Sequence, residues 1–147
     1  MRLDLTAREA HWFWDELETN AISFTPGEGA DWSWFTFQRG VADDPEYPDM
    51  NTVHVELDDQ SQGGYYDLAG VLFLPDRIEI AFAKDQLFLD RYRTACILLP
   101  EPVDRRIVDF FANGLFLGNR ISYGSEFPEN DRVEQTEFPH MIDDQEV

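Results

Sequence analysis

Short segments in which apolar and polar residues alternate, separated by turns, constrain the fold of this chain most. The alternation runs over residues 53–57 and again over 78–82, which follow a tight turn at Pro75-Asp76. A period of two is typical of a strand with one buried face. Residues 68–74 are mostly apolar, and residues 92–99 are apolar on both faces, which favours a place inside a sheet. These segments predict an antiparallel meander.

The first forty residues are expected to add a helix and two strands. Residues 6–9, Thr-Ala-Arg-Glu, have the spacing of a capping box, and the apolar residues behind them recur on one helical stripe. An amphipathic helix is therefore predicted over 7–18. A short strand is predicted at 21–25. The run 32–39 is rich in Trp, Phe and Thr, and the shift in its aromatic phase predicts a bulge or a strand covered on both faces.

A second helix is expected after the prolines of residues 100–102, which stop the preceding strand and fix the first helical turn. Apolar residues recur from Val103 at the i, i+4, i+7 and i+8 positions, and Gly114 or Gly118 ends the pattern. Residues 58–66 are predicted to be a turn or a long hairpin loop. The predicted fold class is α+β, with an antiparallel sheet of about five strands packed against one or two helices.

One domain is expected over residues 1–120, because chains split into several domains only beyond roughly 250 residues. Residues 121–147 are turn-rich and acidic, so they are predicted to form an acidic C-terminal tail. Single apolar residues in this tail are expected in part to dock back on the domain. These residues are Phe127, Val133, Phe138, Met141 and Ile142.

The net charge of −19 excludes several classes of partner. Nucleic acid and anionic membranes need Lys and Arg at the contact, and the chain has 11 basic against 30 acidic side chains. Residues 41–67 hold eight acids and no Lys or Arg, and residues 121–147 hold eight acids and one Arg. A basic protein partner and a general adaptation to solubility or salt both explain such acidity, and the uneven distribution favours the partner.

The compartment follows from what the sequence lacks. No apolar stretch approaches the 18 residues of a membrane span, and the first residues do not follow the charged-then-apolar pattern of a secretory signal. The one cysteine, Cys96, lies in an apolar run, where we interpret it as a small buried hydrophobe rather than a nucleophile. A cytoplasmic protein without a disulfide is predicted.

Residues for catalysis or metal binding are not arranged in a known pattern. The three histidines, His11, His54 and His140, share no metal-ligand spacing. The pair His54 and Glu56 points to one side of a strand and could bind a partner or act as a base, but only Ser61 lies nearby as a nucleophile. A calcium site at Asp58, Asp59 and Asp67 lacks the alternating oxygen pattern of such loops. We predict no enzyme activity, no cofactor and no metal.

The acidic block with its tyrosines is the predicted partner-binding site. Exposed Tyr supplies contact area with a polar tip, although Tyr next to a glycine turn equally often covers the edge of a core. The site is predicted to comprise Asp43, Asp44, Glu46, Tyr47, Glu56, Asp58, Asp59, Tyr65 and Tyr66.

Several short motifs resemble the immunity protein 10 family of bacterial polymorphic toxin systems. They are Phe37-Gln38-Arg39, the run 53–60 with the sequence VHVELDDQ, and Gln62-Gly63-Gly64-Tyr65. A hairpin at 71–80 and a late strand and helix at 94–117 continue the resemblance. The Trp-rich N-terminal segment and the acidic tail depart from the family.

The resemblance implies a non-enzymatic, cytoplasmic antidote that binds and neutralises a cognate toxin domain. Associated toxins are often nucleases with basic substrate faces, which an acidic protein can occlude after fast, steered association. The alternative is a small-molecule-binding or enzymatic α+β domain with an aromatic pocket under Trp32 and Trp34. The sequence leaves the oligomeric state open.

Overall fold

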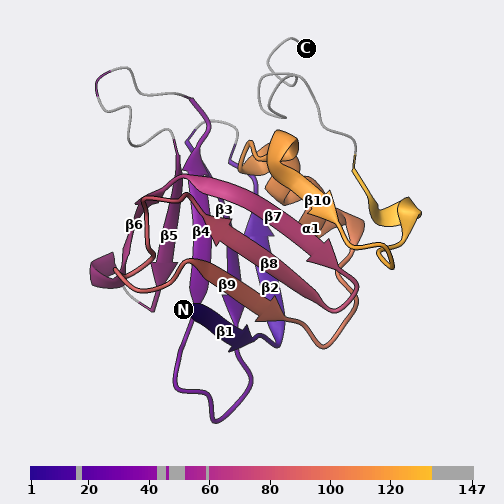
Figure 1. Cartoon of the computed structure of the whole chain (residues 1–147), viewed down its shortest axis with the longest axis horizontal. Coiled ribbons are helices and arrows are strands. Elements are labelled where there is room, and N and C mark those ends of the chain that lie inside the picture. The colour runs from indigo at the N-terminus through magenta and orange to yellow at the C-terminus, as the bar shows by residue number, and fades with distance from the viewer. Residues whose placement is uncertain (16–17, 43–45, 47–51, 59, 134–147) are drawn as a thin grey trace.

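The chain forms a sandwich of two sheets with one short α-helix at its side (Figure 1). The structure, a computed structural model, describes residues 1–15, 18–42, 46, 52–58 and 60–133. These residues make ten strands in two five-stranded sheets. The predicted α+β class is confirmed, with strands dominating. The single sheet of about five strands is wrong, because the N-terminal half builds a complete sheet of its own.

Sheet B, at the back in Figure 1, is an antiparallel meander in which each strand pairs with its neighbours in sequence. Its inward positions are apolar, as the buried Ile22, Phe24 and Phe37 show. In spatial order its strands are β2 (Glu9–Phe13), β3 (Thr19–Thr25), β4 (Phe35–Gly40), β5 (Val53–Leu57) and β6 (Gly63–Tyr66).

Sheet A, at the front, combines a central antiparallel part with two parallel pairs at its edges. Leu3 of β1 pairs with Ala95 of β9, and Ile121 of β10 pairs with Val71 of β7, both in parallel. Both ends of the described chain therefore belong to this sheet. In spatial order its strands are β1 (Arg2–Thr6), β9 (Thr94–Leu98), β8 (Arg77–Phe82), β7 (Leu68–Leu74) and β10 (Ile121–Tyr123).

The chain crosses between the sheets twice, at very short connections. Ala7 and Arg8 join β1 to β2: the Ala7 amide donates to Leu98 of sheet A at 2.8 Å, and the Arg8 amide donates to Thr25 of sheet B at 2.7 Å. Asp67 alone separates β6 from β7. Because the backbone groups at the first crossing are paired on both sides, the sheets are held together there without a loop.

The helical segment begins at Asp104, whose carboxylate accepts hydrogen bonds from the amides of Arg106 and Ile107 at 2.8 and 3.2 Å. Helix α1 (Arg105–Asp109) continues into a π-helical turn, η3 (Phe110–Gly114). The predicted apolar stripe is confirmed, since Val103, Ile107 and both Phe residues of η3 are buried. The prolines precede the helix rather than forming its first turn.

Removing the helix cap is expected to have a modest, measurable effect. Asp104→Ala should lower the free energy of unfolding by about 1 kcal/mol, because two backbone amides lose their acceptor. Asp104→Asn keeps an acceptor oxygen and should cost only a few tenths of a kcal/mol. Urea unfolding of both variants measures the difference, and equal losses would mean that the charge, not the cap, matters.

Two phenylalanines outside the strands close the sides of the sandwich. The Phe111 ring of η3 lies 5.7 Å from that of Phe37 in sheet B and 5.6 Å from that of Phe73 in sheet A. On the side away from α1, Phe88 from the β8–β9 connection lies 5.7 Å from Phe35 of sheet B and 5.5 Å from Phe82 of sheet A (Figure 1). Each ring thus joins the two sheets into one core.

The predicted helix over 7–18 is wrong, because residues 9–13 form β2 and the capping-box spacing falls on the crossing between the sheets. In β2, Ala10 and Trp12 pack toward the core, whereas His11 and Phe13 face outward and are exposed. The same residues fit both a period of two and a helical period. The period of two is the one adopted, because the segment pairs with β3.

Further strand boundaries differ from the predicted ones. Strand β4 begins at Phe35, so the aromatic phase shift after Trp32 and Trp34 marks the start of a strand rather than a bulge. Residues 63–66, predicted as loop, form the edge strand β6. The predicted strands at 21–25, 53–57, 68–74, 78–82 and 92–99 are confirmed within a few residues, and the last lies inside sheet A as expected.

The domain extends beyond the boundary expected at residue 120. Strand β10 pairs with β7, and Phe127 is 2% exposed in the core. The Val133 amide donates to the hydroxyl of Tyr123 at 2.9 Å, so the docking expected for Phe127 and Val133 is confirmed. The expectations for Phe138, His140, Met141 and Ile142 concern residues outside the described ones.

Candidate functional site

The outward face of sheet B carries the candidate site. Alternation along each strand and the pairing register place one set of side chains on this face, opposite the core. We define the outer face of sheet B by these residues: Glu9, His11, Phe13, Ala21, Ser23, Trp34, Thr36, Gln38, His54, Glu56, Gly63 and Tyr65. Trp34 immediately precedes β4 and reaches this face through its contact with Glu56.

Exposed aromatic side chains mark both ends of this face. Phe13 on edge strand β2 is 56% exposed, and Tyr65 on the opposite edge strand β6 is 38% exposed. The register connects them across all five strands through Ala21, Gln38 and His54. The rings of His54 and Tyr65 lie 5.0 Å apart, edge to face. The two exposed rings therefore lie at opposite edges of one continuous outer face.

Trp34 is held on this face by two carboxylates. Its indole Nε1 donates to Oε2 of Glu56 at 3.1 Å, and the Trp34 side chain is 37% exposed. Asp58 accepts hydrogen bonds from the amides of Ser33 and Trp34 at 2.5 and 3.3 Å, and its own amide donates to the Trp34 carbonyl at 2.9 Å. Asp58 therefore fixes the backbone that carries the indole.

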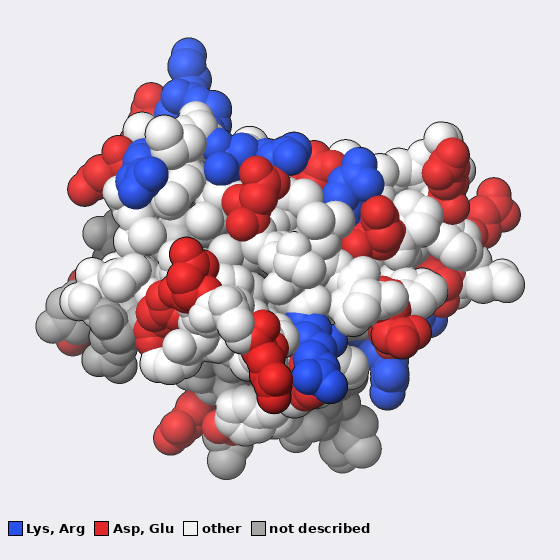
Figure 2. Space-filling view, turned by 90° about the horizontal axis from the view of Figure 1, so that it is seen from below, with Lys and Arg blue, Asp and Glu red and all other residues white. Residues whose placement is uncertain are grey.

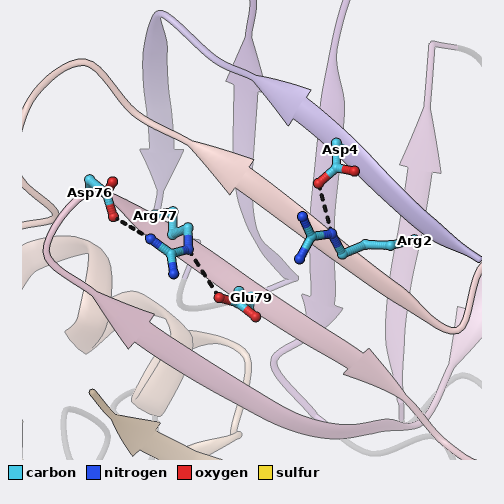
Figure 3. A network of polar contacts seen from close by, with 5 residues as sticks. All are labelled: Arg2, Asp4, Asp76, Arg77 and Glu79. Atoms are coloured by element: carbon cyan, nitrogen blue, oxygen red, sulfur yellow. Dashed lines mark hydrogen bonds and ion pairs between the residues drawn. The ribbon is translucent and has the colours of Figure 1, made fainter. Parts of the chain in front are cut away.

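The two outer faces of the sandwich differ in how their charges are compensated. On sheet A, Arg2 pairs with Asp4 at 2.8 Å, and Arg77 pairs with Asp76 and Glu79 at 2.9 and 3.0 Å (Figure 3). The hydrogen bond to Glu79, together with the charge of Asp76, holds the pKa of Arg77 above its ordinary value. This face therefore neutralises its own carboxylates.

The outer face of sheet B, as defined above, has carboxylates at Glu9 and Glu56 and no Lys or Arg. Glu9 contacts the His11 ring nitrogen Nε2 at 3.1 Å, an exposed pair. In the view from below, most Lys and Arg lie along the upper margin, which is the side of sheet A, and acidic side chains are spread over the whole view (Figure 2). The carboxylates of this face are therefore not paired with a Lys or Arg of the same face.

The structure brings together three of the predicted site residues and separates one. Glu56 and Tyr65 lie on the outer face of sheet B, and Asp58, directly after β5, binds the backbone of Trp34 beside it. Tyr66 is on the opposite side of β6, because it pairs with the buried Val53, and its ring packs edge to face on Phe82 and Phe88 at 5.4 Å each. For Tyr66 the alternative, that it covers the core edge, is correct. Glu46 is exposed. Asp43, Asp44, Tyr47 and Asp59 lie outside the described residues.

Phe13 and Trp34 are residues of this face that the sequence analysis missed. Phe13 lies within the predicted helix over 7–18, although it shares a period-two phase with the polar Glu9 and His11. That phase was the signal that it faces outward. Trp34 lies within the strand predicted over 32–39. No pattern in the sequence links its indole to Glu56, which is distant in sequence.

The residues that the sequence singles out for possible catalysis are not joined into one set. Glu56 contacts Trp34 rather than His54, so the base and orienter suggested by the sequence are not paired with each other. Cys96 is buried at 3% exposure as predicted, and burial raises the pKa of its thiol, which disfavours the nucleophilic thiolate. Within the same residues, no group of three or more His, Cys, Asp or Glu is placed to hold a metal ion.

The aromatic pocket expected under Trp32 and Trp34 differs from the surface hollow that lies on the outer face of sheet A. That hollow, of about 350 Å³, is lined by Arg2, Gly70, Glu79, Ala81 and Thr94, among others. Its lining contains no aromatic side chain.

In the part of the chain that the structure describes, no helix has the length and apolar character required to cross a membrane. Comparisons with protein-family models, with curated proteins and with solved structures find no match for this chain.

Proposed function

We propose that this chain is an immunity protein that binds and neutralises a cognate bacterial toxin domain in the cytoplasm. The observation that carries the proposal is the outer face of sheet B, where exposed Phe13, Trp34 and Tyr65 accompany carboxylates without a Lys or Arg. The overall charge of −19 and the motifs shared with the immunity protein 10 family support the same proposal.

The partner is expected to be a basic domain, with a nuclease as the first candidate. Uncompensated carboxylates attract a basic cleft and speed its association, whereas aromatic anchors that become buried slow dissociation. The face is a sheet surface rather than a cleft, so it suits a protein partner better than a small substrate. Inhibition then follows from occlusion of the toxin's own site, without chemistry by this chain.

Binding kinetics with a cognate toxin domain test the proposal, and a toxin domain found encoded next to this gene would be the first one to try. Phe13→Ala and Tyr65→Ala should raise the dissociation rate, with a cost of about 2 kcal/mol or more if either is a central anchor. Glu9→Gln combined with Glu56→Gln should lower the association rate and flatten its dependence on salt, because exposed charges act within about 8 Å at physiological ionic strength. The carboxylates of Asp43 and Asp44 are expected to add to this steering.

Leu98→Ala is the matched control, since Leu98 is an exposed apolar residue at 37% on the outer face of the other sheet. It should bind like the parent protein. If Leu98→Ala weakens binding while Phe13→Ala and Tyr65→Ala do not, the partner docks on sheet A. Loss of binding only after removal of residues 134–147 would place the contact in the acidic tail.

A further inference from the structure

Trp34 and Glu56 together present an aromatic ring and a carboxylate, the two kinds of group that bind a cation in proteins. In the described residues four aromatic rings lie under an arginine: Phe116 with Arg39, Tyr92 with Arg91, Trp12 with Arg106, and Tyr123 with Arg132. Trp34 is exposed and does not belong to this set. Its ring is the one indole on the outer face of sheet B, a face without Lys or Arg.

The carboxylate beside this ring has one oxygen to offer. Oε2 of Glu56 accepts the indole N–H at 3.1 Å, and Oε1 has no hydrogen-bond donor among the described residues. The next position across the sheet is Gly63, so no side chain flanks Glu56 on that side. A Cβ at Gly63 would lie only 3.2 Å from Cβ of Glu56, so a side chain at this position would crowd Glu56.

The geometry is fixed before any ligand arrives. Asp58 clamps the backbone of Trp34 by three hydrogen bonds, and Glu56 belongs to a strand paired on both sides. A planar guanidinium can stack on an indole face and donate N–H groups to a neighbouring carboxylate at once, whereas an ammonium acts as a point charge. Preorganised groups lose less entropy on binding, so such a site favours arginine.

We propose that Trp34 and Glu56 form a receptor for one arginine side chain of the partner, stacked on the indole and paired with Glu56. This inference rests on the proposed function, since it assigns one contact of the toxin-binding face. It also predicts that arginine is preferred over lysine at this position. Trp34 supplies the stacking surface, Glu56 the charge, and Asp58 only positions Trp34.

A small arginine probe tests the receptor without the toxin. Acetyl-arginine amide is titrated into the full chain at constant ionic strength, and the indole N–H of Trp34, identified with Trp34→Phe, is followed by NMR. The resonance should shift with the arginine probe and at least fivefold less with the neutral acetyl-citrulline amide at equal concentration. The shift caused by Nα-acetyl-lysine amide, whose side-chain ammonium stays charged, should lie between those two shifts.

Two variants that each remove one carboxylate charge distinguish a specific arginine site from a general electrostatic attraction to the face. Glu56→Gln keeps an oxygen for the indole but removes the charge, so it should weaken the arginine probe about fivefold, equivalent to about 1 kcal/mol. Glu9→Gln removes the same charge from the same sheet face and should leave the titration unchanged. Equal shifts with arginine and citrulline, or equal losses in both variants, would overturn the receptor.

The two proposals fail separately. If the arginine probe shifts Trp34 and depends on Glu56 while the toxin domain does not bind, the receptor stands and the proposed function falls. If the toxin domain binds through Phe13 and Tyr65 while the probe leaves Trp34 unmoved, the proposed function stands and the receptor falls.

Discussion

Phe111→Ala is expected to lower the free energy of unfolding by about 3–5 kcal/mol, the range found for truncating a fully buried Phe. The side chain is 0% exposed, and its ring lies 5.6 Å from Phe73 in one sheet and 5.7 and 6.4 Å from Phe37 and Phe24 in the other. Truncation therefore leaves a cavity between two sheets that cannot both relax into it. Domains of this kind are stable by only about 5–15 kcal/mol, so the midpoint of thermal unfolding should fall by roughly 10–20 °C.

Phe13→Ala is the matched control for Phe111→Ala. The residue type and the substitution are the same, but Phe13 is 56% exposed, so its loss should change stability by no more than about 0.5 kcal/mol. Urea unfolding followed by Trp fluorescence measures both variants. A cost below about 1 kcal/mol for Phe111→Ala would show that η3 does not join the two sheets.

Asn20→Leu is expected to cost about 2–3 kcal/mol although it adds apolar surface. The Asn20 side chain is 0% exposed and is bonded at both polar atoms: Oδ1 accepts from the Asp15 amide at 2.8 Å, and Nδ2 donates to the Gly114 carbonyl at 3.2 Å. The bond to Gly114 joins the start of β3 to the end of η3, and the bond to Asp15 joins it to the β2–β3 connection. Leucine fills a similar volume but leaves a donor and an acceptor without partners, each of which costs about 1–3 kcal/mol when buried.

The control for this substitution is Asn119→Leu, at an exposed position of the 3-10 turn η4 (Gly118–Arg120). It should alter the unfolding midpoint in urea very little. Thermal and urea unfolding of both variants decide the matter. If Asn20→Leu were as stable as the parent protein, the apolar gain would outweigh the two hydrogen bonds, and Asn20 would not fasten η3 to sheet B.

The strands that sequence predicts well are those whose period-two pattern has no rival. Residues 53–57 and 78–82 alternate without also fitting a helical stripe, and both are strands. Residues 9–13 satisfy both periods, and pairing with β3, a tertiary interaction, decides between them. No local sequence pattern indicates that the chain passes from one sheet to the other at residues 7–8 and at Asp67. The sequence therefore predicts one sheet where the structure has two.

The candidate site was predictable to the extent that it follows from one strand and its neighbour. Glu56 and Tyr65 lie on adjacent strands within a short stretch of sequence, and their common side follows from alternation. Tyr66 differs from Tyr65 only by one step of that alternation, which places it in the core. The outward direction of Phe13 follows from its period-two phase, but its place on one face with Trp34 and Tyr65 depends on the register of all five strands, which no local pattern reports.

The order in which the strands pair determines which apolar surface the nascent chain exposes during synthesis. All pairs of sheet B join consecutive strands, so this sheet can form as soon as residue 66 has emerged. Its apolar side, with Phe24, Phe35 and Phe37, must then wait for β7, β8 and β9, which supply the opposing layer. Strand β1, made first, must wait for its partner β9 until residue 98 has emerged. The nascent chain is therefore most prone to aggregate, and most in need of a chaperone, while residues 67–98 are being translated.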